Sequence, residues 1–208
     1  QMTRIEPLRP PTDGRRREVL CHEENPRRHA PRRASGAGGT FGYANVYLDP
    51  ELGRTERNLY GSYWRHNSGR HRRVNELLHE QRGALDAAAM AAILADRGDP
   101  RCRMRDAIAM VLTVGSVVFR PEDGAFWVGS GTAPTSRGTF VPFRLSGEDH
   151  APDLEALAPG DGESDEASEA FACLRRAYVA YLDEGDLGAA RREIDRAREL
   201  QPSQAVFH

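Results

Sequence analysis

The sequence contains no lysine. Its lysine and arginine positions number 29, and all of them are arginine. This absence excludes a lysine nucleophile, a Schiff base between lysine and a carbonyl substrate, and the lysine-dependent phosphate loop of Walker type. Nucleotide binding through such a loop is therefore excluded as well. Together with the abundant alanine, glycine and arginine, the missing lysine is typical of a protein encoded by a GC-rich bacterial genome.

Cysteine and long apolar runs are also scarce. The three cysteines, Cys21, Cys102 and Cys173, form an odd and widely spaced set, which argues against a disulfide framework or a zinc site built from cysteines. No apolar run approaches the roughly 20 residues of a membrane span, and no apolar segment of a secretory signal follows the first residue. We therefore expect a cytoplasmic protein that has no membrane segment, no metal site and no cofactor.

The 208 residues are enough for one medium domain, or for one domain with an appendage. Charge is distributed unevenly along them. Residues 1–40 hold nine arginines against five acidic residues, a net charge of +4, whereas residues 148–208 hold six against fifteen, a net charge of −9. The basic arm has no aromatic residue before Phe41, and this argues against nucleic-acid binding through stacked bases.

The composition divides the chain into four parts. Residues 1–40 are rich in proline and glycine and read as an irregular, arginine-rich arm, in which short strands around residues 3–5 and 18–21 would survive. Residues 41–145 read as an α+β domain. Residues 146–168 are acidic and rich in proline, glycine and serine, as in a linker. Residues 169–204 read as a helix pair.

Within the α+β domain, residues 41–48 alternate as in a strand, and a helical stretch follows from Glu51. Apolar spacing predicts a helix over residues 69–81, and Asp86 is a candidate N-cap for a second helix that ends near residue 96. Residues 115–119 and 125–128 predict a hairpin around a Pro-Glu-Asp-Gly turn, and residues 140–145 predict a third, edge strand.

The final helix pair resembles a single tetratricopeptide-type repeat. The spacing that carries this resemblance runs over Leu174, Tyr178, Tyr181, Gly185, Ala190, Ile194, Ala197 and Pro202. The apolar stripes Leu174–Tyr178–Tyr181 and Ile194–Ala197–Leu200 are expected to face one another, with small residues allowing close approach. One such repeat buries too little surface alone, so it is expected to dock on the main domain or on another chain.

Four pieces of the chain, in the same order, resemble a known enzyme family. They are Ala44-Asn45-Val46-Tyr47, Asn67-Ser68-Gly69-Arg70, the stretch from Leu85-Asp86 to Leu94-Ala95-Asp96, and Thr113–Val118 with Phe126–Gly131. In this order they are similar to the C-terminal half of the acyl-coenzyme A:isopenicillin N acyltransferase-like proteins. These proteins are autoproteolytic N-terminal-nucleophile (Ntn) hydrolases, and the resemblance implies part of their αββα sandwich.

The resemblance implies roles for three residues. Asn45 takes the position of the asparagine that donates to the oxyanion on the attacked carbonyl, although Val46 and Ala44 replace the His and Thr that usually flank it. Ser68 and Arg70 would bind a substrate carboxylate, because guanidinium offers two parallel donors. The alternative is that Ser68 is an N-cap residue and that Arg70 lies on a solvated helix face.

The nucleophile of the family is a cysteine well over a hundred residues before this asparagine. Here only Cys21 precedes Asn45, and its neighbour His22 should point to the opposite face of a strand. We therefore expect the chain to lack its nucleophile, which a separate N-terminal half or subunit would supply. The expected substrate is an acyl-amide or acyl-coenzyme A small molecule. The alternative function is a non-catalytic interaction module that uses the C-terminal helix pair.

Overall fold

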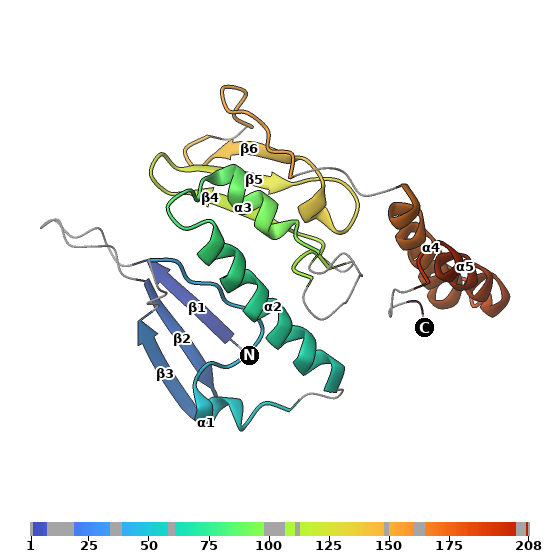
Figure 1. Cartoon of the computed structure of the whole chain (residues 1–208), viewed down its shortest axis with the longest axis horizontal. Helices are drawn as coiled ribbons and strands as arrows, with labels where there is room; N and C mark the ends of the chain where they lie inside the picture. Colours follow the sequence, from blue (N-terminus) through green and yellow to red (C-terminus); the bar gives the residue numbers. More distant parts are fainter. Residues whose placement is uncertain are drawn as a thin grey trace, which may run out of the picture. The chain divides into compact units, whose positions relative to one another are not determined.

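The structure is a computed structural model that describes residues 2–7, 19–33, 39–57, 61–97, 107–110, 113–147, 150–159, 165–202 and 207. The chain divides into two compact units, Gln1–Ala84 and Leu85–His208, which we call the N-terminal and C-terminal units. The expected domain of residues 41–145 thus spans parts of both units. Figure 1 shows the elements of each unit.

The N-terminal unit contains a three-stranded antiparallel sheet in the order β1-β2-β3, formed by Met2–Pro7, Val19–Asn25 and Arg28–Arg33. Asn25 accepts hydrogen bonds from the backbone N–H groups of Arg27 and Arg28, both at 2.9 Å, and so closes the turn between β2 and β3. The first two strands were expected, but β3 was not. Pro31 argued against a strand in this stretch. Proline is tolerated there because β3 is an edge strand.

Residues 41–48 do not form the expected strand. Several of their backbone groups are hydrogen-bonded to side chains instead of to a neighbouring strand. The Asn75 amide accepts from the N–H of Gly42 and donates to its carbonyl, both at 3.1 Å, as a paired strand would do. A Cβ atom on Gly42 would lie 2.7 Å from Cγ1 of Val74, so glycine permits this close approach.

Two helices follow in this unit. The short helix α1, Pro50–Gly53, begins where expected, and Asp49 caps it by accepting from the N–H groups of Glu51 and Leu52. The long helix α2, Gly61–Glu80, begins eight residues before the expected start at residue 69. The apolar spacing of Val74, Leu77 and Leu78, which predicts the helix, lies in its second half and does not reveal where it starts.

The C-terminal unit contains a second antiparallel sheet in the order β4-β5-β6, formed by Val117–Arg120, Ala125–Gly129 and Phe140–Arg144. The expected hairpin and third strand are confirmed. Helix α3, Ala87–Leu94, is capped by Asp86, whose carboxylate accepts from the N–H of Ala89 at 2.7 Å. It lies across the sheet (Figure 1), and the core between them contains Ala91, Val118, Ala125, Trp127 and Phe140.

The segment expected as a linker contributes to this unit. Leu157 exchanges two backbone hydrogen bonds with Phe140, at 2.8 and 3.1 Å, and Ala151 donates to the carbonyl of Pro142. The indole N–H of Trp127 donates to the carbonyl of Glu155 at 2.9 Å. Residues 150–159 therefore extend the edge of the sheet, although their composition is that of a flexible linker.

The chain ends in the expected helix pair, α4 (Asp165–Leu182) and α5 (Leu187–Leu200), joined through Gly185 at φ +69°. Leu174 packs with Ile194, Ala197 and Leu200 in one cluster, as the stripes predict. Tyr178 and Tyr181 do not join it, since they are 56% and 55% exposed. The rest of the cluster is formed by Ala170, Phe171, Cys173 and Phe207.

The described residues thus form a mixed α+β protein with two small antiparallel sheets and five α-helices, ending in a helix pair. Among them, no helix combines the length and the apolar character that crossing a membrane requires.

Candidate functional site

Asn45 lies in a tight turn that precedes α1. The N–H of Val46 donates to the carbonyl of Ala44 at 2.7 Å, and the hydroxyl of Tyr43 donates to the carbonyl of Val46 at 2.6 Å. Val46 is buried while Asn45 is exposed. Burial of Val46 therefore holds the turn in place, and the Asn45 side chain lies at the surface of the N-terminal unit.

Arg70 of α2 fixes the Asn45 side chain. Its Nη2 atom donates to Oδ1 of Asn45 at 2.8 Å and to Oδ1 of Asn67 at 2.9 Å. A guanidinium group only donates, so the amide atom that faces it must be oxygen. The Nδ2 group of Asn45 is therefore directed away from Arg70, where its two N–H donors are available to a ligand.

Arg70 is a poorly solvated cation. Burial lowers its pKa, and its Nε atom is buried without a hydrogen-bond partner. The partners that the structure gives this guanidinium, among the described residues, are the two neutral amides of Asn45 and Asn67. A carboxylate bound here would supply a counter-charge and two good acceptors.

Ser68 is not brought into this cluster. It lies two residues before Arg70 on α2, and residues two apart point to different sides of a helix. Asn67, three residues before Arg70, takes the place expected for Ser68, and it is only 8% exposed. The i, i+3 spacing of Asn67 and Arg70 was visible in the sequence and was the signal that could have identified this pair.

A buried carboxylate supports the segment that carries Asn45. Glu23 of β2 is fully buried. It accepts from the N–H of Leu48 at 2.5 Å and from the N–H of Asp49 at 2.8 Å, and it shares the single proton of the Tyr43 hydroxyl, 3.1 Å away, with the carbonyl of Val46. Glu23 thus ties both ends of the Asn45 turn to the sheet. Sequence reasoning missed this role, because the partners are backbone groups that carry no sequence signal.

Cys21 does not meet the needs of a nucleophile. Its side chain has no exposed surface, and it lies on the same face of β2 as Glu23. His22 points to the other face, where its Nδ1 atom lies 2.8 Å from Nε2 of His29 and the two rings stack. The Cys–His pairing is therefore absent, as the alternation of strand residues predicts.

Two histidines of α2, His66 and His71, are largely removed from solvent. His66 is 9% exposed. Burial lowers the pKa of His71, and the charge of Glu23 opposes that shift. Within the described ranges, no group of three or more His, Cys, Asp or Glu side chains is arranged to hold a metal ion. Cys102 lies outside the described residues.

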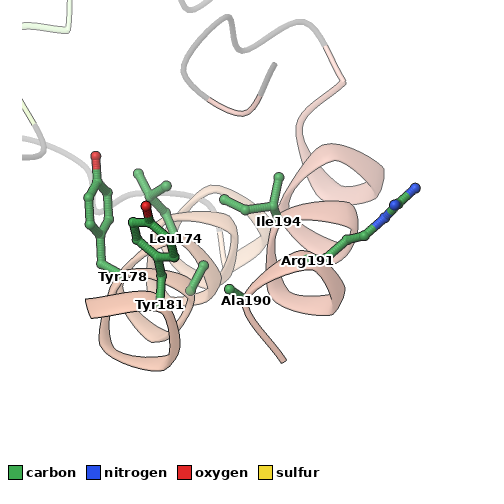
Figure 2. A pocket seen from close by; sticks show the side chains of 7 residues that line it. Leu174, Tyr178, Tyr181, Ala190, Arg191 and Ile194 are labelled. Carbon is green, nitrogen blue, oxygen red and sulfur yellow. The ribbon is translucent and has the colours of Figure 1, made fainter. Parts of the chain in front are cut away.

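A groove between α4 and α5 is the second candidate site. It has a volume of about 450 Å³ and is lined by Leu174, Ala177, Tyr178, Tyr181, Ala190, Arg191 and Ile194. Figure 2 shows both tyrosine rings on the α4 side, while Arg191 points outward from α5. The groove exists because the two tyrosines do not fill the space between the helices.

Comparison of the chain with protein-family models, with curated proteins and with solved structures found no match.

Proposed function

We propose that this chain is the oxyanion-binding part of a cysteine acyltransferase or amidohydrolase that acts on a linear amide bond. In this proposal the nucleophile belongs to a separate N-terminal half or subunit, and the family is that of the Ntn hydrolases described above. Asn45 donates to the carbonyl oxygen, and Arg70 binds a carboxylate of the same substrate. The final helix pair is then a tetratricopeptide-like appendage.

The observation that carries the proposal is the orientation of the Asn45 amide. An oxyanion donor must be aimed before the charge develops, because its advantage over water is that it needs no reorganisation. Arg70 provides this by holding Oδ1 and thereby directing Nδ2 outward. A turn-forming asparagine with no further role would not need an arginine from a helix 25 residues away along the chain.

The surroundings of Arg70 support the proposal that it binds a substrate carboxylate, because its partners among the described residues are two neutral amides. A cation that burial has already partly desolvated gains more from a bound carboxylate than a fully hydrated one does. Asn45 and Arg70 are in direct contact, so one small molecule that carries an amide carbonyl and a carboxylate would reach both. Ser68 has no part in this arrangement.

The test is calorimetric titration of the full chain with N-benzoylglycine, which has one linear amide and one carboxylate. The expected dissociation constant is about millimolar, as for a small ligand held by a few polar contacts. Asn45→Ala and Arg70→Met should each weaken binding by about tenfold or more, the loss expected for a charge-assisted hydrogen bond. Asn25→Ala is the matched control, since it removes an asparagine from another turn of the same unit.

Binding that is unchanged in both variants, or no binding by the parent chain, would overturn the proposal. N-methylbenzamide, which keeps the linear amide but lacks the carboxylate, separates the two parts. It should bind to the parent chain more weakly than N-benzoylglycine does, and Asn45→Ala should weaken its binding further.

The groove between α4 and α5 favours a second function, that of a non-catalytic interaction module. Its walls combine exposed aromatic rings with an apolar floor, as in surfaces that receive a partner helix. An accessible groove should bind the dye 8-anilinonaphthalene-1-sulfonate. Ala190→Arg, which places a long side chain in the groove, should abolish the fluorescence gain, whereas Leu187→Arg on the exposed surface should not. Equal fluorescence in the parent chain and Ala190→Arg would contradict this function.

A further inference from the structure

Helix α4 carries two apolar stripes. The first consists of small side chains that are buried against α5 and recur three or four positions apart, namely Ala170, Cys173, Ala177 and Ala180. The second consists of the larger residues Leu174, Tyr178 and Tyr181, which line the groove between the helices. Residues three and four positions apart share one face of a helix, so each stripe is a surface for packing. A helix of a four-helix bundle needs two such surfaces, because it packs against two neighbouring helices.

The structure supplies one of the two neighbours. In the part of the chain that the structure describes, α5 is the helix that packs along α4, and the stripe of larger residues stays open to solvent. Nine large apolar residues are exposed among the described ones, and five of them lie between residues 178 and 187. Such a concentration of exposed apolar side chains marks a surface that meets another protein.

The shape of the groove is complementary to itself. Its floor contains Ala177 and Ala190, whose short side chains leave a space of about 450 Å³. Tyr178 and Tyr181 stand at its α4 side, next to this space (Figure 2). One surface therefore carries both a hollow and the large side chains that would fill it. The tyrosine rings of one copy can enter the groove of a second copy, as knobs enter holes in a helix bundle.

The groove also carries opposite charge toward its two ends. The turn between α4 and α5 forms one end, where Asp183 and Glu184 are exposed and have no ion pair with any described residue. Along α5, away from this turn, lie Arg191 at the groove and Arg198 about two turns further on the same face. These two guanidinium groups share one carboxylate, that of Asp195, at 3.7 and 3.3 Å. The turn thus has an excess of negative charge, and the α5 side has an excess of positive charge.

This distribution of charge favours an antiparallel second copy as the partner. A two-fold axis through the middle of the groove reverses the direction of the second helix pair. The acidic turn of each copy then lies beside Arg191 and Arg198 of the other copy, and the same contact forms twice. In a parallel arrangement like charges would meet at both ends, which disfavours binding.

We propose that two copies of the chain dock groove to groove, with their helix pairs antiparallel, and form a four-helix bundle. The proposal rests on the second function given above, the interaction module, and names its partner. In the dimer, Tyr178 and Tyr181 are removed from water, and α4 gains its second neighbour. Asn45 and Arg70 take no part in the contact.

The test is sedimentation equilibrium of the full chain from about 1 to 100 µM. The parent chain should be a dimer with a dissociation constant of about 10 µM or below, as for a small interface. Two charge-reversed variants are compared with it, Asp183→Arg with Glu184→Arg, and Arg191→Glu with Arg198→Glu. Each variant alone should dimerise at least about tenfold more weakly, because like charges then meet at both ends of the groove.

An equimolar mixture of the two charge-reversed variants should dimerise about as well as the parent chain. In the mixed dimer, the basic turn of one variant lies beside the acidic α5 of the other, and the second contact is that of the parent chain. Only a contact between the turn of one copy and α5 of another predicts this recovery. A mixture that stays monomeric would overturn the proposal.

A second pair of variants keeps the test decisive if the charge-reversed chains do not fold. Tyr181→Ser removes one exposed ring from the groove and should weaken the dimer by about tenfold. Phe119→Ser is the matched control, since it removes a similarly exposed ring from β4 and should leave the dimer unchanged. Equal weakening by the two substitutions would overturn the proposal.

A monomeric parent chain at 100 µM would also overturn it, and this includes the cases in which another segment of the chain or a different protein covers the groove. The dye experiment described above separates this failure from failure of the interaction module. If Ala190→Arg abolishes the fluorescence gain while the parent chain is monomeric, the groove binds ligands but its partner is not a second copy. If the dye does not report the groove either, both the module and the dimer are refuted.

Discussion

Arg70 donates from one guanidinium nitrogen to the side-chain oxygens of both Asn45 and Asn67, at 2.8 and 2.9 Å. This contact connects an exposed turn with the buried side of a helix. It sets the direction of the Asn45 amide without a neighbouring histidine or threonine. Val46, which replaces the expected histidine, serves instead as the buried anchor of the turn.

Loss of the Arg70 guanidinium should destabilise the N-terminal unit. Arg70→Met leaves the buried amide oxygen of Asn67 without its donor, at a cost of about 1–3 kcal/mol in the free energy of unfolding. The control is Arg72→Met on the same helix, which removes an exposed ion pair with Glu76 worth about 0.5 kcal/mol or less. Urea unfolding measures both, and equal effects would contradict a special role for Arg70.

Glu23→Gln should disturb the Asn45 turn. The carboxylate accepts from two N–H groups and shares the Tyr43 hydroxyl proton with the Val46 carbonyl, and glutamine would turn an NH₂ group toward one of these donors. We expect a loss of about 2–4 kcal/mol in stability, the range for a buried, charge-assisted network left incomplete. Glu24→Gln, at the next and less buried position of β2, should cost far less. Thermal unfolding compares the two variants, and equal melting temperatures would be the contrary result.

The Arg120–Asp123 pair predicts a pH dependence. The guanidinium of Arg120 lowers the pKa of Asp123 from 3.8 to about 2. A carboxyl group whose pKa is lower in the folded state stabilises the fold above its unfolded pKa. That contribution is lost as the pH falls through the folded value, here between about pH 4 and pH 2.

The expected result is that Asp123→Asn reduces the slope of stability against pH in this window. Glu122→Gln removes the same charge from the same turn but leaves the hydrogen bonds between Arg120 and Asp123 in place. Its slope should match that of the parent chain. Identical slopes for the parent chain and Asp123→Asn would refute the prediction.

The C-terminal helix pair should depend on Ala197. This residue has no exposed surface and lies in the cluster between α4 and α5. Ala197→Arg would force a charge into that cluster, at a cost of several kcal/mol, about 3–5 by the scale for an unpaired buried charge. Leu187→Arg, at a position that is 67% exposed, is the control. Circular dichroism should show loss of helix in the first variant of the full chain and none in the second.

The elements that the sequence predicted are those with local signals. The β4–β5 hairpin follows from a Pro-Glu-Asp-Gly turn between β-branched and aromatic residues, and α3 follows from the cap residue Asp86. The helix pair follows from two apolar stripes and Gly185. In each case the residues that determine the element lie within a few positions of one another.

Where the sequence-based prediction was wrong, the structure depends on contacts between residues that lie far apart in the sequence. Residues 41–48 alternate like a strand, but the Asn75 amide, 33 residues away, occupies the backbone groups of Gly42. The linker composition of residues 150–159 did not reveal the exchange of hydrogen bonds between Leu157 and Phe140. Asn45 and Arg70 were both chosen from the sequence as site residues, but their contact and the part played by Asn67 required the structure.

The proposed division of the active site predicts that the chain alone is inactive. Cys21 is buried, and the donors of Asn45 only stabilise an oxyanion that a nucleophile has created. Purified chain should therefore not hydrolyse a chromogenic acyl anilide or acyl-coenzyme A above background. Turnover that is lost in Cys21→Ala and kept in Cys173→Ala would restore Cys21 as the nucleophile.

The orientation of the Asn45 amide is the central claim, and side-chain amide resonances report on it directly. In a ¹⁵N-labelled full chain, the NH₂ pair of Asn45 is identified by its loss in Asn45→Asp. Titration with N-benzoylglycine should move that NH₂ pair and leave the pair of Asn25 in place, and the movement should disappear in Arg70→Met. If the Asn45 resonances stay fixed while N-benzoylglycine is added to millimolar concentration, Asn45 is not the donor proposed here.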